Sequence, residues 1–323
     1  MTDYVKPKVL VSKCIGFDSC RFNGGIISSE VVDTLQEQVK FVPVCPEVEI
    51  GLGVPRKALR LVKKDGEPRL IQTETREDYT EEMKHYAEGL FSKIGEIDGA
   101  ILKNRSPSCG TTDVKAYADL DKSGVIEKAP GIFGGAVKDR YPFKPIENEG
   151  RLRNFRIRED FYTSLFAIAR FRQRVEGKGS ISELTDFQAR HKFILMAYDQ
   201  DKMRKLGRMA ANPDEKEIEK IIQDYRELLS KVLSENPSPG SHVNVLQHAY
   251  GYFSDELENR EKSLFDDYIE DYRKGKVPLS SIISMIRSWI ARFDRDYLEE
   301  QRYFDPYPRE LMDISDSGKG RDL

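Results

Sequence analysis

Short apolar runs alternate with longer amphipathic stretches throughout the first half of the chain. Three of these runs have the length and composition of buried strands: residues 9–12, 41–44 and 99–102. Residues 79–94 place apolar side chains at helical spacing, and Ser28 or Ser29 is expected to begin another helix. Strands that alternate with helices predict a parallel sheet with right-handed crossovers. The first part of the chain is therefore expected to be a Rossmann-like α/β domain.

The connections in this half carry the residues that turns prefer. A hairpin is expected around Lys64, Asp65 and Gly66, within an otherwise irregular stretch, and a short helix is expected at residues 134–140. Parallel sheets bind their ligands beyond the carboxyl ends of the strands. The turns that follow the three predicted strands are therefore where functional residues are expected.

From Arg151 onward the pattern is helical, and no strand signal follows. Turns rich in Pro and Asn separate the amphipathic stretches. At 323 residues the chain has enough apolar material for two domains of ordinary size. The predicted division is an α/β domain, a connecting helix, an all-helical domain and a flexible tail, at residues 1–150, 151–179, 180–312 and 313–323.

The composition is that of a chain without a membrane segment. Charged residues make up 33% of the sequence, and no apolar run approaches the roughly 20 residues that cross a bilayer. The first residues lack the basic and then apolar pattern of a secretory signal, so a cytoplasmic protein is expected. The cytosol keeps thiols reduced, and the four cysteines of such a chain are more often metal ligands or catalytic groups than disulfides.

Charge is distributed unevenly along the chain. The whole sequence carries a net charge of −3, yet residues 151–210 hold 14 Lys or Arg against 7 Asp or Glu, an excess of 7 positive charges. Most charged runs are solvated faces of helices. A basic run within an acidic chain is a better candidate for binding anions, including the phosphates of nucleic acids.

All four cysteines lie in turn-like segments of the first part of the chain. Cys14, Cys45 and Cys109 each follow one of the predicted strands within a few residues. The carboxyl ends of parallel strands meet at one edge of a sheet, so these thiols are expected to gather there around a metal ion or an iron–sulfur cluster. A four-thiolate zinc site is an alternative, and some of the cysteines could be ordinary buried residues.

Cys20 stands apart from this group, between the first strand and a glycine-rich turn. It is interpreted as a spectator, as a redox partner of Cys14 or as a fourth ligand. If Cys20 is not a ligand, three thiolates leave one coordination position of the metal centre open. An open position is typical of centres that bind substrate, whereas structural sites are closed.

Groups suited to proton transfer lie beside these cysteines. Glu47 follows Cys45 closely and could activate a water molecule, whereas Glu49 is better explained as a surface acid. Ser106 and Ser108 precede the last cysteine. Either could orient a substrate, although serines in turns often bond only to the backbone.

The segments that contain these residues are VSKCIG (11–16), CRFNGG (20–25), PVCPEV (43–48), GLGVPR (51–56), KNRSPSCG (103–110), GIFG (131–134) and EGRL (149–152). In combination, over residues 7–153, they resemble the TudS family of thiouracil and 4-thiouridine desulfidases. The stretch at 187–208, with FQARHKFILMAY and KLGR, resembles the helical domain that is fused to TudS domains in the longer members. Those longer members are tRNA 4-thiouridine desulfidases.

The resemblance implies an enzyme that replaces C=S by C=O in 4-thiouridine of tRNA or in a related thiolated pyrimidine. It implies a 4Fe–4S cluster with three protein ligands, whose fourth iron binds the sulfur of the substrate. The implied ligands are Cys14, Cys45 and Cys109. Glu47, with Ser106 or Ser108, is implied to assist the hydrolysis. A soft sulfur prefers iron to water, and its binding polarises the C=S bond. The substrate base must be flipped out or single-stranded to reach such a site.

The all-helical domain is expected to bind tRNA, because Lys and Arg neutralise the nucleic-acid backbone. Its candidate contacts are Arg190, Lys192, Arg204, Lys205 and Arg208. The expected partner is tRNA or a thiolated nucleoside or base, and no membrane partner is expected. Two other interpretations compete with this one. The first is a desulfidase of free thiopyrimidines, and the second is a zinc- or cluster-bearing module that binds RNA or senses stress without catalysis.

Overall fold

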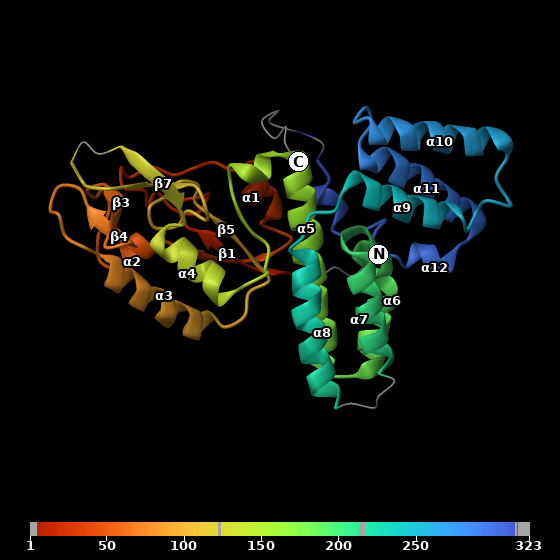
Figure 1. Cartoon of the computed structure of the whole chain (residues 1–323), viewed down its shortest axis with the longest axis horizontal. Coiled ribbons are helices and arrows are strands. Elements are labelled where there is room, and N and C mark those ends of the chain that lie inside the picture. Colours follow the sequence, from red (N-terminus) through yellow and green to blue (C-terminus); the bar gives the residue numbers. More distant parts are fainter. Residues whose placement is uncertain (1–4, 122–123, 213–216, 314, 316–323) are drawn as a thin grey trace. The chain divides into compact units, whose positions relative to one another are not determined.

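A four-stranded parallel sheet forms the centre of the first part of the chain, with the strand order β2-β1-β5-β8. Figure 1 labels two of its strands, β1 and β5. All three strand pairings are parallel. The strands are β1 (Lys8–Ser12), β2 (Lys40–Val44), β5 (Gly99–Leu102) and β8 (Ile146–Asn148). The three predicted strands and the predicted parallel sheet are confirmed. Strand β8 escaped prediction because its three residues carry a single apolar side chain.

Two hydrophobic cores lie on the two faces of this sheet. Successive residues of a strand point to opposite faces, so Leu10 enters one core while Val9 and Val11 enter the other. The helices that complete the first core are α3 (Thr80–Ile94) and α4 (Ile132–Arg140). Those that complete the second are α1 (Glu30–Leu35) and α5 (Phe155–Arg170).

The local signals for two helices, the cap of α1 and the apolar spacing of α3, are confirmed. Ser29 caps α1, where its hydroxyl accepts a hydrogen bond from the amide of Val32 at 3.5 Å. Helix α3 buries Met83, Ala87 and Phe91, which recur at the helical spacing that the apolar pattern predicted. These helices therefore form where side chains on one face can enter a core.

A second four-stranded sheet was not predicted, apart from its hairpin. Its strand order is β4-β3-β6-β7, and β3 pairs with β4 in antiparallel register across Asp65 and Gly66. These two residues have φ values of 53° and 86°, the left-handed conformation of a tight hairpin turn. The strands are β3 (Leu59–Lys64), β4 (Glu67–Gln72), β6 (Val114–Tyr117) and β7 (Val125–Ala129). Charged residues interrupt the apolar pattern of these strands, and for this reason the sequence pattern did not predict them.

After β8, the described residues form helices and the turns that connect them, and no strand, as predicted. The remaining helices of the first part and of the junction are α2 (Pro46–Glu49), η1 (Arg151–Arg153), η2 (Phe171–Glu176, a π-helix) and η3 (Arg309–Leu311). The others are α6 (Ile181–Tyr198), α7 (Gln200–Ala211), α8 (Ile218–Leu233), α9 (Pro239–Tyr250), α10 (Asn259–Arg273), α11 (Leu279–Phe293) and α12 (Asp296–Glu299). Among the described helices, none is both long and apolar enough to cross a bilayer.

The computed structural model describes residues 5–121, 124–212, 217–313 and 315. The chain divides into two compact units, Met1–Ala169 with Tyr307–Leu323, and Arg170–Pro306. This division differs from the predicted boundaries at 150 and 179, because α5 packs in the second core of the sheet. Tyr307 and Leu311 belong to the same core, so the end of the chain returns to the first unit. The predicted tail at 313–323 lies mostly outside the described residues.

Candidate active site

The turns that follow β1, β2 and β5 line one cavity of about 470 Å³ at the carboxyl edge of the parallel sheet. Cys14 lies just beyond β1, Cys45 directly follows β2, and Cys109 lies in the turn after β5. Cys20 lines the same cavity. The fold therefore brings all four thiols together, while their role as ligands stays a prediction.

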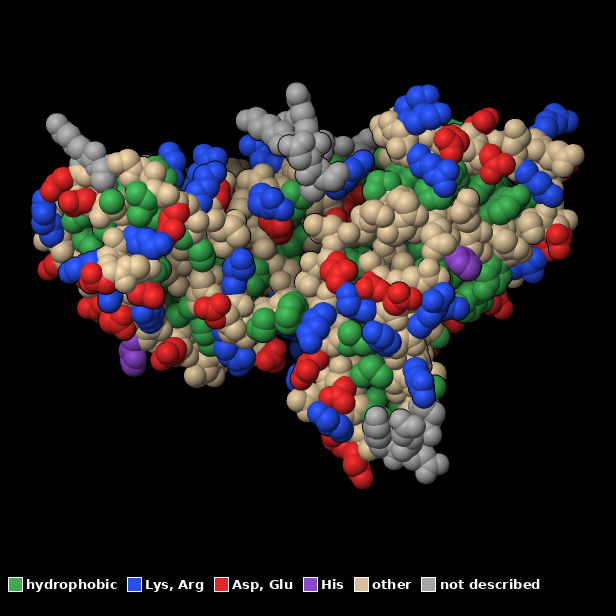
Figure 2. Space-filling view, viewed as in Figure 1, with side chains coloured by type: hydrophobic (Ala, Val, Ile, Leu, Met, Phe, Trp, Pro, Cys, Tyr) green, Lys and Arg blue, Asp and Glu red, His purple; other side chains and the backbone are tan. Residues whose placement is uncertain are grey.

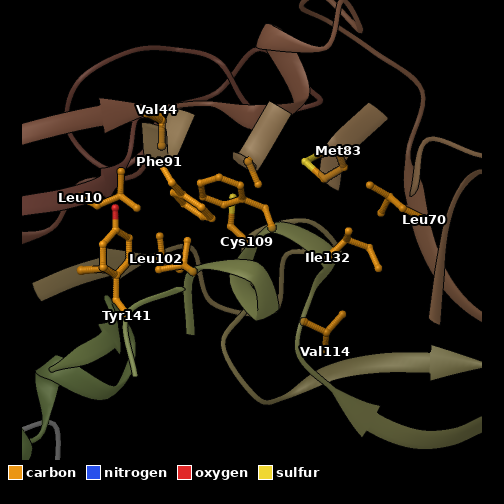
Figure 3. Packing of buried hydrophobic residues seen from close by; sticks show 14 of the residues in the cluster. Leu10, Val44, Leu70, Met83, Phe91, Leu102, Cys109, Val114, Ile132 and Tyr141 are labelled. Atoms are coloured by element: carbon orange, nitrogen blue, oxygen red, sulfur yellow. The ribbon is translucent and has the colours of Figure 1, made fainter. Parts of the chain in front are cut away.

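Three of the four cysteines of this cavity are buried, and Cys14 is half-buried. Cys109 belongs to the first core of the sheet, where Figure 3 shows it among Phe91, Leu102 and Ile132. Burial raises the pKa of Cys109 well above its usual value, and burial likewise raises the pKa of Cys14 to about 11. Both thiols are therefore protonated at neutral pH in the absence of a metal, which would have to displace these protons to bind.

Cys20 is buried beside Cys45. The Cys45 thiol donates a hydrogen bond to the backbone carbonyl of Cys20, with a sulfur-to-oxygen distance of 3.7 Å. Burial, followed by the neighbouring Cys45, raises the pKa of the Cys20 thiol to about 12. Proximity alone thus does not separate Cys20 from the three predicted ligands.

The carboxylate of Glu47 is held by the guanidinium of Arg56. The Arg56 Nε donates to Oε2 of Glu47 at 2.6 Å, and its Nη2 lies 2.5 Å from the same oxygen. The two side chains are only 4% and 12% exposed, so water screens this pair weakly. Both bonds end on Oε2, and Oε1 accepts no hydrogen bond from the described residues. This second oxygen is the one available to a water molecule in the cavity.

Arg56 also joins the segments that carry the cysteines. Its Nη1 donates to the carbonyl oxygens of Cys20 at 2.9 Å and Gly53 at 3.0 Å, and its Nη2 lies 4.0 Å from the Cys45 sulfur. The pattern of the sequence does not indicate a role for this arginine. Arg56 is the last residue of the GLGVPR segment, and its place in that motif is the one sequence feature that could have indicated a function. Its contact with Glu47 is visible only in the folded chain.

The two candidate serines occupy different positions. Ser106 lines the cavity, and its hydroxyl oxygen accepts hydrogen bonds from the amides of Cys109 at 3.0 Å and Ser108 at 3.3 Å. Its hydroxyl proton is left to donate elsewhere. Ser108 is fully buried, is absent from the described lining, and its hydroxyl has no partner among the described residues. Ser106 is therefore the serine that can meet a molecule in the cavity.

A second cavity, of about 660 Å³, adjoins this site through Asn104, which lines both. Lys103 lines the first cavity and forms an ion pair with Glu149, which lines the second. Glu149 also accepts a hydrogen bond from the amide of Asn104 at 2.8 Å. The described lining of the second cavity contains no cysteine, so the sulfur chemistry belongs to the first.

The arrangement of the donors suits a polynuclear cluster better than a single ion. No group of three or more His, Cys, Asp or Glu side chains in the described ranges could hold one metal ion. The thiols instead surround a cavity, and a cluster of several irons needs ligands farther apart than one zinc ion does. Thiolates are the soft donors that iron–sulfur clusters use. The residues that line the cavity therefore fit such a cluster.

One of the two predicted phosphate-binding residues on α6, Arg190, is already paired with carboxylates of the protein. Arg190 donates to both carboxylate oxygens of Asp186, at 2.7 and 2.8 Å, and to Glu300 at 3.1 Å. Lys192 is half-buried on the same helix. Arg190 is thus already neutralised by two carboxylates, and it is a poor candidate for binding phosphate.

The predicted contacts on α7 are more available. Arg204 pairs with Asp201 at 3.3 Å, whereas the exposed Lys205 and Arg208 have no ion pair with any residue that the structure describes. Figure 2 shows Lys and Arg interspersed with Asp and Glu over the visible face of the molecule. The basic excess of the sequence is therefore not gathered into one large patch on that face.

Comparison with known proteins identifies relatives of both parts of the chain. Residues 9–149 match the family model described as 2-thiouracil desulfurase, and residues 192–308 match a family described as a protein of unknown function, DUF1722. The uncharacterized protein YbgA of Escherichia coli (strain K12) is 29% identical over 155 residues, which are 48% of this chain and 91% of YbgA. The uncharacterized protein YbbK of Bacillus subtilis (strain 168) is 36% identical over 110 residues, 32% of this chain and 73% of YbbK. Among solved structures, the 4Fe–4S-dependent thiouracil desulfidase TudS matches with 30% identity and a TM-score of 0.37, over 46% of this chain and 93% of its own.

Proposed function

Because the chain belongs to the 2-thiouracil desulfurase family through residues 9–149, we propose that it replaces C=S by C=O in a thiolated pyrimidine, and that its natural substrate is 4-thiouridine in tRNA. The observation that carries this proposal is the cavity in which the cysteine thiols meet the carboxylate of Glu47. The balanced reaction consumes one water molecule and releases hydrogen sulfide, without oxidation or reduction. No other function is favoured by a specific feature of the cavity.

We assign a 4Fe–4S cluster to this cavity. The related solved desulfidase depends on such a cluster, and the donor set of this chain suits one. Cys14, Cys45 and Cys109 would hold it, and Cys20 would stay outside the ligand set. When bound, the cluster supplies an iron with an open position, where the soft sulfur of the substrate binds and the C=S bond is polarised.

The protein supplies the proton transfer. Glu47 Oε1, which accepts no other hydrogen bond from the described residues, removes a proton from the water that attacks the ring carbon. Arg56 holds the carboxylate through Oε2, which leaves Oε1 for this role. The hydroxyl of Ser106 donates a hydrogen bond to the substrate, and its own oxygen is held by two backbone amides. These groups are held by hydrogen bonds before the substrate arrives, which lowers the cost of reaching the transition state.

The second unit supports an RNA substrate. Residues 192–308 match a family model of their own, so this unit is a distinct module joined to the desulfidase part. Lys205 and Arg208 of α7 are exposed and form no ion pair with any described residue, so they can contact the phosphates of RNA. We also propose a cytoplasmic location, where tRNA is found and thiols stay reduced.

The decisive experiment is the loss of 4-thiouridine from tRNA under anaerobic conditions, measured by nucleoside analysis, with free 4-thiouracil assayed in parallel. The wild-type chain is expected to carry about four irons and four sulfides and to release sulfide in proportion to the 4-thiouridine lost. Turnover of 4-thiouracil without any action on tRNA would retain the desulfidase and reject its RNA substrate. A protein that carries zinc and releases no sulfide would reject the desulfidase itself.

Glu47→Gln tests the role of the carboxylate. It should keep the iron content and lose activity by a factor of about 100 or more, the usual contribution of a general base. Glu49→Gln is the matched control, since Glu49 is exposed on the same short helix and does not line the cavity. Equal activity of the two variants would remove Glu47 from the mechanism.

A further inference from the structure

An exposed aromatic ring stands at the mouth of the cysteine cavity. Phe22 lines the cavity, yet 45% of its surface is accessible to solvent. Its backbone carbonyl accepts a hydrogen bond from the amide of Arg56 at 2.8 Å. Two further backbone bonds close the turn that carries it, from Gly24 to Arg21 at 2.9 Å and from Arg21 to Gly25 at 3.2 Å. The ring is therefore presented to solvent by a fixed turn.

Two other apolar side chains lie exposed near this turn. Ile26 is 49% exposed and Val54 is 42% exposed. A Cβ placed on Gly24 would lie 4.0 Å from Val54, so the turn and the loop that contains Val54 are in contact. Large apolar side chains exposed together indicate a binding surface. Three of them are too few for a stable protein interface, which needs about 20 residues on each side.

The same mouth carries unbalanced positive charge. Four cations and one carboxylate line the cavity: Arg21, Arg56, Lys103, Arg105 and Glu47. Arg56 is neutralised by Glu47, and Lys103 is neutralised by Glu149 outside the lining. The remaining cations are Arg21 and Arg105.

The two remaining guanidiniums are poorly paired. Arg21 lies 5.8 Å from the centroid of the Phe22 ring and has no ion pair within the described ranges. Arg105 is 78% exposed, and its carboxylate neighbour Asp113 is 3.6 Å away. Arg105 also has a φ of 55°, an unfavourable backbone conformation for a residue with a side chain.

We propose that Arg21, Phe22 and Arg105 form an RNA-binding rim that holds the strand on either side of the nucleotide entering the cavity. Phe22 stacks on a flanking base, and the two arginines contact the adjacent phosphates. Proteins recognise unpaired RNA by this combination of aromatic stacking and cationic contact. The inference rests on the proposed function, and it places RNA contacts in the desulfidase part as well as on α7.

Binding of a single-stranded oligoribonucleotide that contains one 4-thiouridine tests the rim. The anaerobic holoenzyme is titrated with this RNA, and kcat/KM for free 4-thiouracil is measured on the same preparations. Phe22→Ala should raise the Kd for RNA about tenfold, because one base stack is worth roughly 1–3 kcal/mol. Its kcat/KM for the free base should fall by a smaller factor than its affinity for RNA, and Phe22→Tyr should preserve both values. Phe143→Ala is the matched control, because Phe143 is 46% exposed and does not line the cavity.

Salt dependence tests the two arginines. Arg21→Gln and Arg105→Gln should each lower the slope of log Kd against log salt by about 0.7, the loss of one phosphate contact on a single strand. Unchanged slopes together with an unchanged Kd in Phe22→Ala would overturn the rim. An equal loss for RNA and for the free base in Phe22→Ala would also overturn it, since the ring would then contact the target base.

The outcomes keep the rim and the proposed function apart. Turnover of 4-thiouracil by the wild-type chain, with RNA binding unaffected by the rim variants, would reject the rim and leave the desulfidase intact. Absence of turnover on every thiolated pyrimidine would reject the desulfidase. The Kd values would then still decide whether the rim binds RNA.

Discussion

Arg56 is the side chain on which the geometry of the cavity depends most directly. A guanidinium carries five N–H donors in a planar fork, and Arg56 uses them for Glu47, for two backbone carbonyls and for close approach to Cys45. An ammonium group carries the same charge but cannot make these contacts in one plane. Charge alone therefore does not explain why an arginine occupies this place.

Arg56→Lys is expected to lower kcat by a factor of about 10 to 100, because misplacing a reacting group by about 1 Å has an effect of this size. Iron content should change little. The measurement is steady-state turnover of 4-thiouracil together with iron analysis. Arg76→Lys serves as the control, because Arg76 is 64% exposed and pairs with Asp121 on the surface. Full activity in Arg56→Lys would show that the position needs only a positive charge.

At the scale of elements, the start of α4 packs against the turn that carries Cys109. A Cβ on Gly134 would lie 2.2 Å from the carbonyl oxygen of Gly110 and 2.6 Å from that of Cys109. A Cβ on the adjacent Gly135 would meet only the side chain of Pro130, at 3.7 Å. The absence of a side chain at Gly134 is therefore what allows this helix and this turn to touch.

Gly134→Ala is expected to lower the free energy of unfolding by about 1–3 kcal/mol, the usual cost of overpacking, and to reduce iron content by displacing Cys109. Gly135→Ala should be neutral or should stabilise by up to about 1 kcal/mol, since alanine favours the helix. Chemical denaturation and iron analysis of the two variants provide the comparison. Equal stability of both variants would contradict the close approach described here.

Helix α5 contains two acidic side chains, Glu159 and Asp160, whose ionised forms are destabilised by burial. Burial raises the pKa of Glu159 and of Asp160 to about 7 each, although the Tyr307 hydroxyl donates to Glu159 at 3.3 Å. Both groups bind protons more tightly in the folded chain than in the unfolded chain. The free energy of unfolding should therefore fall as pH rises from about 4 to about 7, and this loss should be complete above that range.

Asp160→Asn should remove part of this loss, because the amide stays neutral. The melting temperature should rise relative to the wild type at pH 8 and should differ little at pH 4. Thermal unfolding at both pH values measures the effect. Asp139→Asn is the control, because Asp139 is exposed on α4. It should change the melting temperature equally at both pH values. A stabilisation by Asp160→Asn that is independent of pH would indicate a cause other than ionisation.

At the scale of the whole molecule, the first unit is built from two distant parts of the chain. Tyr307 and Leu311 lie in the same core as α1 and α5, and the Tyr307 ring contacts that of Tyr162 with a centroid distance of 5.4 Å. Deleting everything after about residue 180 would therefore damage the desulfidase part as well as remove the helical one. A test of the helical unit must keep residues 307–313 in place.

Leu311→Ala is expected to destabilise the first unit by about 2–5 kcal/mol, because Leu311 is only 2% exposed and its truncation leaves a cavity in the core. Met312→Ala should have little effect, since the neighbouring Met312 is 46% exposed. Thermal unfolding followed together with 4-thiouracil turnover measures both. Equal effects of the two variants would mean that the returning segment does not stabilise the sheet.

Much of this architecture could be predicted from local patterns. Apolar runs located β1, β2 and β5, helical spacing located α3, and the turns after the strands pointed to Cys14, Cys45 and Cys109. Periodicity reports these features because it records which side of an element is buried. The position of Glu47 close to Cys45 suggested that it activates a water molecule, and the resemblance of the motifs to a family implied the same role.

What the sequence by itself determined was thus the class of the elements and the residue types of the site. Only the tertiary structure decided that Arg56 holds Glu47, that Ser106 rather than Ser108 lines the cavity, and that the chain returns to the first unit at Tyr307. The tertiary structure also revealed the second sheet, because the charged residues in its strands leave little apolar periodicity in the sequence. The physical reason is common to all four: each depends on which segments and side chains meet in the folded chain, and periodicity contains no record of that.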